Sequence, residues 1–152
     1  MRTVILAIGK QRRGPLGELQ AEYAGRLRPA PAILEFEEKR KLPPAQLRAR
    51  EAELILAAAP PGARLVALDE AGAPWSSRDL AERLAAWRDQ GLAALAFAIG
   101  GADGLGPAVI ARADDIVSLG AMTWPHLLVR PLLLEQLYRA QQILAGHPYH
   151  RD

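Results

Sequence analysis

Two glycine-containing segments of the chain could bind a small ligand. Residues 99–107 (IGGADGLGP) and 118–126 (SLGAMTWPH) each follow an apolar run that predicts a strand. Glycine lets a ligand approach the backbone, and the carboxyl ends of parallel strands line the crevice where open α/β sheets bind ligands. The second segment has no charged side chain, which suits an adenine ring and a sulfonium better than a phosphate. We therefore expect the two bends to lie side by side around an uncharged cleft.

The first of these segments fits no phosphate-binding pattern. The dinucleotide fingerprint requires a glycine three residues after Gly106, where Val109 stands. A P-loop requires lysine and then serine or threonine after its last glycine, but Pro107 and Ala108 follow here. A nucleotide-binding oxidoreductase or a flavodoxin-like protein is therefore disfavoured. Each segment taken alone is equally compatible with a structural turn.

A third candidate region is the C-terminal stretch of residues 126–152, which holds all three histidines. The spacing of its apolar residues predicts an amphipathic helix over residues 132–145, and Gly146 is a typical end for it. The following tail, residues 147–151, reads HPYHR. Its aromatic rings and guanidinium group suit base stacking and phosphate contact with RNA. A frayed polar terminus is the alternative.

Short apolar runs alternate with segments of helical spacing along the whole chain. The runs predict five strands, at residues 3–8, 33–37, 65–68, 95–99 and 116–119. Helices are expected to begin at Pro43-Pro44 and at Ser76-Ser77, and Gly91 is a typical end for the second of these. The alternation predicts an α/β fold with one parallel sheet covered on both faces.

The bulk composition indicates one domain and excludes several kinds of site. A chain of 152 residues, half of them apolar, can bury one proper core, so we expect a single domain over residues 1–152. Without cysteine it has no disulfide, thiolate zinc site or cysteine nucleophile, and no other metal ligands group together. No apolar run is long enough for a membrane span, so we expect a cytoplasmic protein with neither membrane nor metal.

The basic residues permit an RNA partner without requiring one. The net charge is +2, and all but three of the 19 basic residues are arginine, which suits bidentate phosphate contact. Residues 39–41 (KRK) precede two prolines and predict an exposed loop. That loop is either a solvated turn or a contact with RNA.

The three regions, in this order and at these distances, resemble the SPOUT-class methyltransferases, and among them the family of ribosomal large subunit methyltransferase H. The tail HPYHR is the most distinctive signature. Further matching segments are spread along nearly the whole chain. They are residues 7–10 (AIGK), 68–69 (LD), 74–75 (PW), 99–101 (IGG), 125–126 (PH) and 137–140 (LYRA).

This resemblance implies a SPOUT fold with a deep trefoil knot, expected within about residues 65–152. It also implies a homodimer and S-adenosylmethionine as the methyl donor. The implied acceptor is N3 of a pseudouridine in the helix 69 hairpin of 23S ribosomal RNA on the assembled 70S ribosome. A binding module that grips ribosomal RNA without chemistry remains the alternative.

The resemblance also implies roles for individual residues. His126, Arg130 and His150 are expected in the catalytic site, with either histidine as the proton acceptor, because neutral imidazole takes up a proton near pH 7. Arg130 is alternatively an anchor for phosphate or a base edge. The RNA is expected to contact Arg139, Tyr149, His150 and Arg151. Around the cofactor we expect Leu68, Gly100, Gly101, Leu119, Gly120, Ala121, Met122, Thr123 and Trp124.

The sequence departs from that family at three positions. Gly106 stands where serine is common, and Trp124 stands where a smaller aliphatic residue is usual. Pro131 follows Arg130 directly, which fits a helix that begins there, because a proline in the first turn loses no hydrogen bond. Since the tail is polar and a dimer is implied, we expect the tail of one subunit to complete the pocket of the other.

Overall fold

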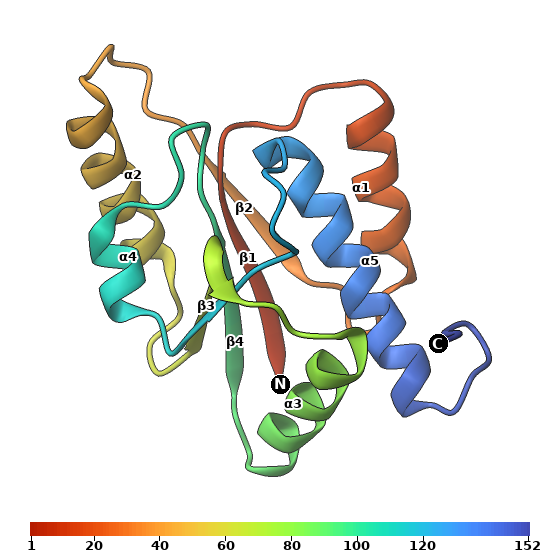
Figure 1. Ribbon diagram of the computed structural model, residues 1–152. Coiled ribbons are helices and arrows are strands. Elements are labelled where there is room, and N and C mark those ends of the chain that lie inside the picture. Colours follow the sequence, from red (N-terminus) through yellow and green to blue (C-terminus); the bar gives the residue numbers. More distant parts are fainter.

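A five-stranded parallel sheet forms the centre of the computed structural model, which describes residues 1–152 (Figure 1). The strand order is β2-β1-β4-β3-β5. The strands are β1 (Arg2–Ile8), β2 (Ala32–Phe36), β3 (Arg64–Ala73), β4 (Ala94–Ile99) and β5 (Asp115–Val117). The helices are α1 (Pro15–Arg26), α2 (Pro44–Ala58), α3 (Ser77–Asp89), α4 (Pro107–Arg112) and α5 (His126–Leu144). The predicted α/β class and parallel sheet are confirmed.

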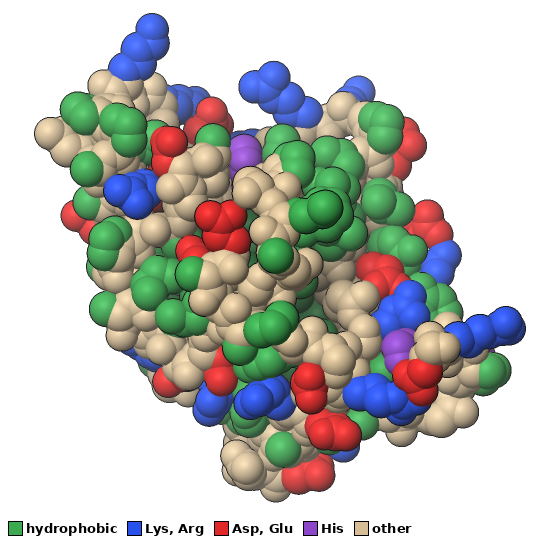
Figure 2. All heavy atoms as spheres, in the orientation of Figure 1, with side chains coloured by type: hydrophobic (Ala, Val, Ile, Leu, Met, Phe, Trp, Pro, Cys, Tyr) green, Lys and Arg blue, Asp and Glu red, His purple; other side chains and the backbone are tan.

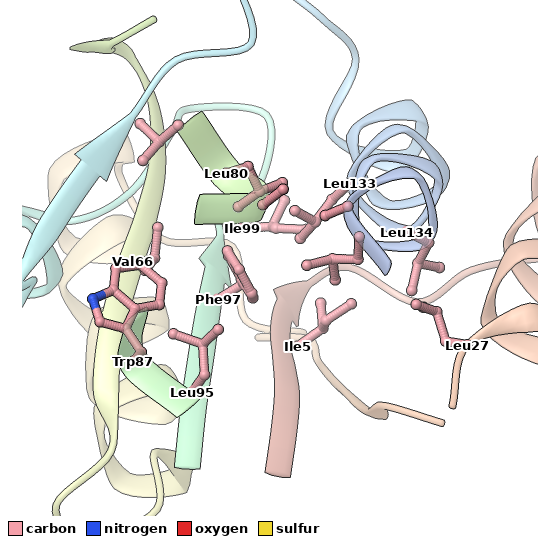
Figure 3. Packing of buried hydrophobic residues seen from close by; sticks show 14 of the residues in the cluster. Ile5, Leu27, Val66, Leu80, Trp87, Leu95, Phe97, Ile99, Leu133 and Leu134 are labelled. Carbon is pink, nitrogen blue, oxygen red and sulfur yellow. The ribbon is translucent and has the colours of Figure 1, made fainter. Parts of the chain in front are cut away.

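Helices cover both faces of the sheet, and each face has its own core. Side chains alternate along a strand, so Ile5 and Phe97 face α1, α3 and α5, whereas Leu6 and Ala98 face α2 and α4. Figure 3 shows the first core, in which Ile5 and Phe97 lie near Leu133 of α5. All six residues of β4 are buried, as expected for a central strand of a parallel sheet.

The local signals for helix starts and ends agree with the structure. A proline occupies the first turn of α1, α2 and α4, where its missing N–H costs no hydrogen bond. Ser76 caps α3: its hydroxyl accepts from the Asp79 N–H at 3.0 Å, and the Asp79 carboxylate accepts from the Ser76 N–H at 2.8 Å. Gly91 follows α3 with φ of 80°, which confirms it as a stop.

Two elements are longer than predicted. Strand β3 continues to Ala73 through an irregularity that places both Leu68 and Ala73 opposite Val117 of β5. Helix α5 begins at His126, six residues before the predicted start, so Pro131 lies inside the helix. The prediction that Pro131 opens the helix is wrong. Its missing N–H leaves the Leu127 carbonyl without a helical partner.

The structure contains no helix that is both long enough and apolar enough to cross a bilayer. It also contains no group of three or more histidine, aspartate or glutamate side chains able to hold a metal ion.

Candidate active site

A cleft of about 420 Å³ opens at the carboxyl edge of the sheet. Its walls are the segments that follow β3, β4 and β5, and the beginning of α5 closes one side. Eight of the nine residues predicted to contact the cofactor line it, and Ala121 does not. The eight are Leu68, Gly100, Gly101, Leu119, Gly120, Met122, Thr123 and Trp124. The two glycine-containing bends therefore lie side by side, as expected.

The paired glycines after β4 are required by the bend itself. A Cβ at Gly100 would lie 2.5 Å from the Gly104 carbonyl carbon, and one at Gly101 would lie 3.0 Å from a carboxylate oxygen of Glu51. These glycines let the bend fold onto itself and onto α2, and both of them also line the cleft. Gly104, with φ of 81° and open space at its Cβ position, is needed for its backbone conformation.

The bend after β5 is held by a local hydrogen-bond pair. The buried Ser118 hydroxyl donates to the Gly120 carbonyl at 2.6 Å and accepts from the Gly120 N–H at 3.1 Å. Gly120 has φ of 118°, which a residue with a side chain rarely adopts. Beyond this turn, the Met122 side chain is 75% exposed and that of Trp124 41%. Two large apolar groups therefore stand at the mouth of the cleft.

The expectation of an uncharged cleft is wrong, because Arg48, Asp69, Glu70 and Asp103 also line it. Glu70 accepts a hydrogen bond from the Thr123 hydroxyl at 3.0 Å, which joins two walls of the cleft. Asp69 and Glu70 follow the predicted strand at 65–68 directly, so their position at the sheet edge was available from the sequence. Arg48 comes from α2, and only tertiary packing brings it here.

A buried carboxyl group lies behind the bend after β4. Glu51 of α2 is only 6% exposed, and burial, helped by the nearby charge of Asp103, raises its pKa. Burial therefore disfavours the charged form of the carboxyl group beneath Gly101.

His126 lines the cleft at the first turn of α5, and its imidazole makes no hydrogen bond in the structure. Burial and the neighbouring positive charge of Arg130 lower its pKa below the ordinary value of 6.5. The ring lies against the end of β1, where a Cβ on Gly9 would be 3.1 Å from Nε2. His126 is thus a neutral imidazole with a free ring nitrogen, which can accept a proton near pH 7.

Arg130, one helical turn further along α5, lies inside the protein and has no exposed surface. Its guanidinium donates to the carbonyls of Ile8 and Gly9 at 2.6 and 2.5 Å, and to the Glu35 carboxylate at 2.8 Å. In this position it cannot reach a phosphate or a base. Its visible role is to fix the ends of β1 and β2 against α5, beside His126.

The C-terminal tail forms a separate polar cluster on the far part of α5. Glu135 accepts from Arg139 at 2.5 Å and from the Tyr149 hydroxyl at 3.1 Å. Burial and this bond to Glu135 raise the pKa of Tyr149 to about 12. Arg139 also donates to Nδ1 of His150 at 3.2 Å, so Nε2 carries the proton and donates to Asp152 at 3.0 Å. These residues, here called the tail cluster, do not line the cleft of their own chain.

Among the predicted RNA contacts, Arg139, Tyr149 and His150 are half-buried in the tail cluster, and Arg151 is exposed without a partner. A second hollow of about 450 Å³ lies between the cluster and the cleft. Glu135 borders it on one side, and Leu119, Gly120 and Trp124 border it on the other. The bend after β5 therefore separates two hollows, and the tail cluster lies beside one of them.

The fold is an α/β fold with a cleft at the carboxyl edge of its sheet, which is where open α/β sheets bind ligands. A family model described as Predicted SPOUT methyltransferase matches residues 1–150. The chain belongs to the SPOUT methyltransferase family. A probable methyltransferase from Bordetella pertussis has a similar fold, with a TM-score of 0.54 at 14% identity over 91% of this chain and 93% of that one. A probable methylase family protein from Haemophilus influenzae gives 0.53 at 13% identity over 99% and 70%.

Full-length relatives share one name, ribosomal RNA large subunit methyltransferase H. The protein of that name from Paramagnetospirillum magneticum is 58% identical over 99% of both chains. Those from Rhodospirillum rubrum and Rhodospirillum centenum are 55% identical over 100% and 54% identical over 99% of both chains. The resemblance stated from the residue motifs is confirmed.

Proposed function

We propose that this protein transfers a methyl group from S-adenosylmethionine to N3 of a pseudouridine in the helix 69 hairpin of 23S ribosomal RNA. The substrate would be the assembled ribosome. The relatives support ribosomal RNA as the acceptor through their name. The observation that carries the proposal is the cleft itself, in which eight residues expected at the cofactor surround a space bordered by a free, neutral imidazole.

The residues of the cleft fit the methyl donor. A volume of about 420 Å³ is within the usual range for a small-molecule site. Leu68, Leu119 and Met122 offer apolar walls for an adenine ring. Carboxylates at Asp69 and Asp103 can accept from ribose hydroxyls or an ammonium group, and they favour a cationic ligand electrostatically. The acidic side chains that contradict an uncharged cleft therefore suit a positively charged donor.

Alignment is the main contribution that this chain can make to methyl transfer. When bound, S-adenosylmethionine supplies a methyl carbon on a positively charged sulfur. A carbon–nitrogen bond forms at N3 as the carbon–sulfur bond breaks, so the cleft must hold the two reactants in line. The N3–H proton must also leave. The His126 imidazole accepts it, and the imidazolium then releases it to solvent.

His126 is a better proton acceptor than His150 in this structure. The imidazole of His126 has no hydrogen bond and lines the cleft. Both ring nitrogens of His150 are engaged, one by Arg139 and the other by Asp152. His150 would therefore have to break a bond before it could act as a base.

Mass spectrometry of ribosomal RNA tests the proposed reaction. Cells that lack the gene should lose one methyl group on one pseudouridine, and the wild-type gene should restore it. A gene carrying His126→Ala should not. An unchanged modification pattern in the deletion strain would contradict the proposal. Calorimetry with S-adenosylmethionine separates it from a non-catalytic RNA-binding module, which should show no heat of binding.

We also propose that the protein is a homodimer in which the tail of one subunit completes the active site of the other. The exposed Met122 and Trp124 at the cleft mouth support an apolar contact with a second chain. Mixed dimers test the arrangement: one subunit lacks residues 147–152, and the other cannot bind the cofactor. A tail that acts across the interface gives one working site per dimer, whereas a tail that serves its own cleft gives none.

We further propose that the chain within residues 65–152 carries the trefoil knot and that the protein is cytoplasmic. Membership of the SPOUT methyltransferase family supports the knot, because the resemblance to that family implies it. A crystal structure in which the segment after residue 118 threads through no loop of the preceding chain would contradict the knot.

A further inference from the structure

The parallel strands all begin at one edge of the sheet, here called the amino edge. Almost all arginines at this edge are paired with a carboxylate or a backbone carbonyl. Arg64 bonds to Asp115 at 2.7 Å, Arg112 to Asp114 at 3.2 Å and Arg88 to Asp89 at 3.3 Å. Arg26 pairs with Glu22, and Arg28 donates to the Gly25 and Leu27 carbonyls at 2.6 and 2.7 Å. Arg2 is the only arginine at this edge without a partner. Here the basic residues serve mostly to neutralise local charge.

Cations at the carboxyl edge differ, because most of them have no partner. Five exposed side chains in the loops after β1 and β2 make no hydrogen bond, ion pair or cation–π contact; we call them the basic rim. They are Lys10, Arg12, Arg13, Lys39 and Lys41. Figure 2 shows Lys and Arg side chains projecting into solvent at the end of the molecule where Figure 1 places these loops.

Nearby carboxylates do not cancel this charge. Arg40, which lies in the same loop as Lys39, is held by Glu38 at 3.0 Å, and Arg50 also bonds to Glu38 at 3.2 Å. Glu37 is the remaining carboxylate of the two loops, so five free cations stand against one free acid. The surplus positive charge faces solvent.

The basic rim is continuous with the cleft. Strands β1 and β2 pair in register, with Ile8 opposite Phe36, so their loops leave the sheet as neighbours. Gly9 borders the ring of His126, and Lys10 follows it directly. On the other side, the unpaired Arg48 lines the cleft itself. Positive side chains therefore extend from the proposed site of chemistry along the edge of the sheet.

We propose that the basic rim binds the phosphate backbone of the substrate RNA on either side of the acceptor nucleotide. This inference rests on the proposed methylation of RNA. Free lysine and arginine side chains can neutralise phosphates without first breaking an ion pair. Contacts of this kind position a nucleic acid without reading its sequence, which suits an enzyme whose specificity lies in the cleft.

Two variants of equal charge change test the rim. In the rim variant, glutamine replaces Lys10, Arg12, Arg13, Lys39 and Lys41. In the control variant, glutamine replaces five exposed arginines of the amino edge, namely Arg2, Arg26, Arg28, Arg88 and Arg112. A double variant, R12Q/R13Q, serves if the larger rim variant does not fold by circular dichroism. Methyl transfer to ribosomes and the affinity for S-adenosylmethionine are measured for each protein over a series of salt concentrations.

The rim variant should raise KM for ribosomes at least tenfold while kcat and the affinity for S-adenosylmethionine stay within twofold. The slope of log affinity against log salt should become shallower by about 3 to 5, because each lost phosphate contact removes about 0.7 to 0.9. The control variant should change the KM for ribosomes and the salt slope only slightly. Equal effects of the two variants would overturn the proposal that the basic rim binds the RNA backbone.

Two further outcomes distinguish a failure of the proposed function from a failure of the proposed RNA binding by the basic rim. If the wild-type protein transfers no methyl group, the proposed function fails, and direct binding of the RNA hairpin by the same variants still tests the rim. If the rim variant loses affinity for ribosomes but not for the isolated hairpin, the rim contacts another ribosomal component, and the phosphate assignment is overturned.

Discussion

The cleft and the tail cluster both contain residues expected at the active site, but their side chains are in opposite states. In the cleft, His126, Asp103 and Arg48 have no hydrogen-bond partner. In the tail cluster, Glu135, Arg139 and His150 are bonded to one another or to their neighbours. Groups without partners can bind a ligand at no cost in existing bonds. Groups already paired must first give up a bond, so the tail cluster must rearrange to meet RNA.

The largest expected effect separates the two histidines. His126→Ala should lower kcat for methyl transfer by about 10²- to 10⁴-fold, because it removes the proton acceptor. His150→Ala should act mainly on KM, since it alters the tail and not the chemistry. Steady-state kinetics with ribosomes and calorimetry with S-adenosylmethionine measure both. If His150→Ala instead lowers kcat and His126→Ala changes mainly KM, the tail supplies the base.

The second comparison concerns the two arginines of α5. Arg130→Met should lower the free energy of unfolding by about 3 to 5 kcal/mol, because it leaves the Glu35 carboxylate and two backbone carbonyls without their buried donor. Arg139→Met removes a partly exposed pair and should cost about 1 kcal/mol. Denaturant titration monitored by circular dichroism gives both values. Equal losses would mean that Arg130 does not fix the end of β1.

A smaller effect is expected at the bend after β4. Gly100→Ala should weaken S-adenosylmethionine binding about tenfold, because the new Cβ would lie 2.5 Å from backbone and must displace the bend. Gly91→Ala is the matched control: it strains a residue with φ of 80° in open space, far from the cleft, and should cost about 1 kcal/mol of stability without changing affinity. If Gly100→Ala leaves the affinity for S-adenosylmethionine unchanged, this bend is not part of the cofactor site.

The smallest effect is a displacement of the pH profile. Protonated imidazole cannot accept a proton, so kcat should fall on the acid side as His126 gains one. Burial and Arg130 lower the pKa of His126, and the midpoint of that fall should therefore lie below 6.5, with full activity at pH 7. An acid limb centred above 6.5 would contradict a neutral His126 held beside Arg130.

Regular local signals predicted the fold well. Apolar runs placed all five strands to within two residues at their amino ends, and Pro44, Ser76 and Gly91 marked helix boundaries correctly. The extension of β3 to Ala73 escaped prediction because it depends on pairing with Val117, a non-local contact. The early start of α5 escaped because a proline inside a helix is usually disfavoured, and Pro131 therefore indicated a boundary.

The sequence predicted which backbone segments form the cleft better than it predicted the state of the charged side chains. The carboxyl ends of parallel strands meet at one edge of a sheet, which brings Leu68, Gly100 and Leu119 together. The state of an arginine depends on what folds around it, so no local pattern distinguishes the buried Arg130 from the exposed Arg151. For the same reason the bonds of His150 to Arg139 and Asp152 were beyond prediction.

A crystal structure with S-adenosylhomocysteine, the demethylated product, is the most direct test of the cleft as the cofactor site. We predict that the adenosyl group lies between the bends at 100–104 and 119–124, with its sulfur on the side of the cleft that His126 borders. Electron density for the product elsewhere on the protein, with this cleft left free at a saturating concentration, would contradict it.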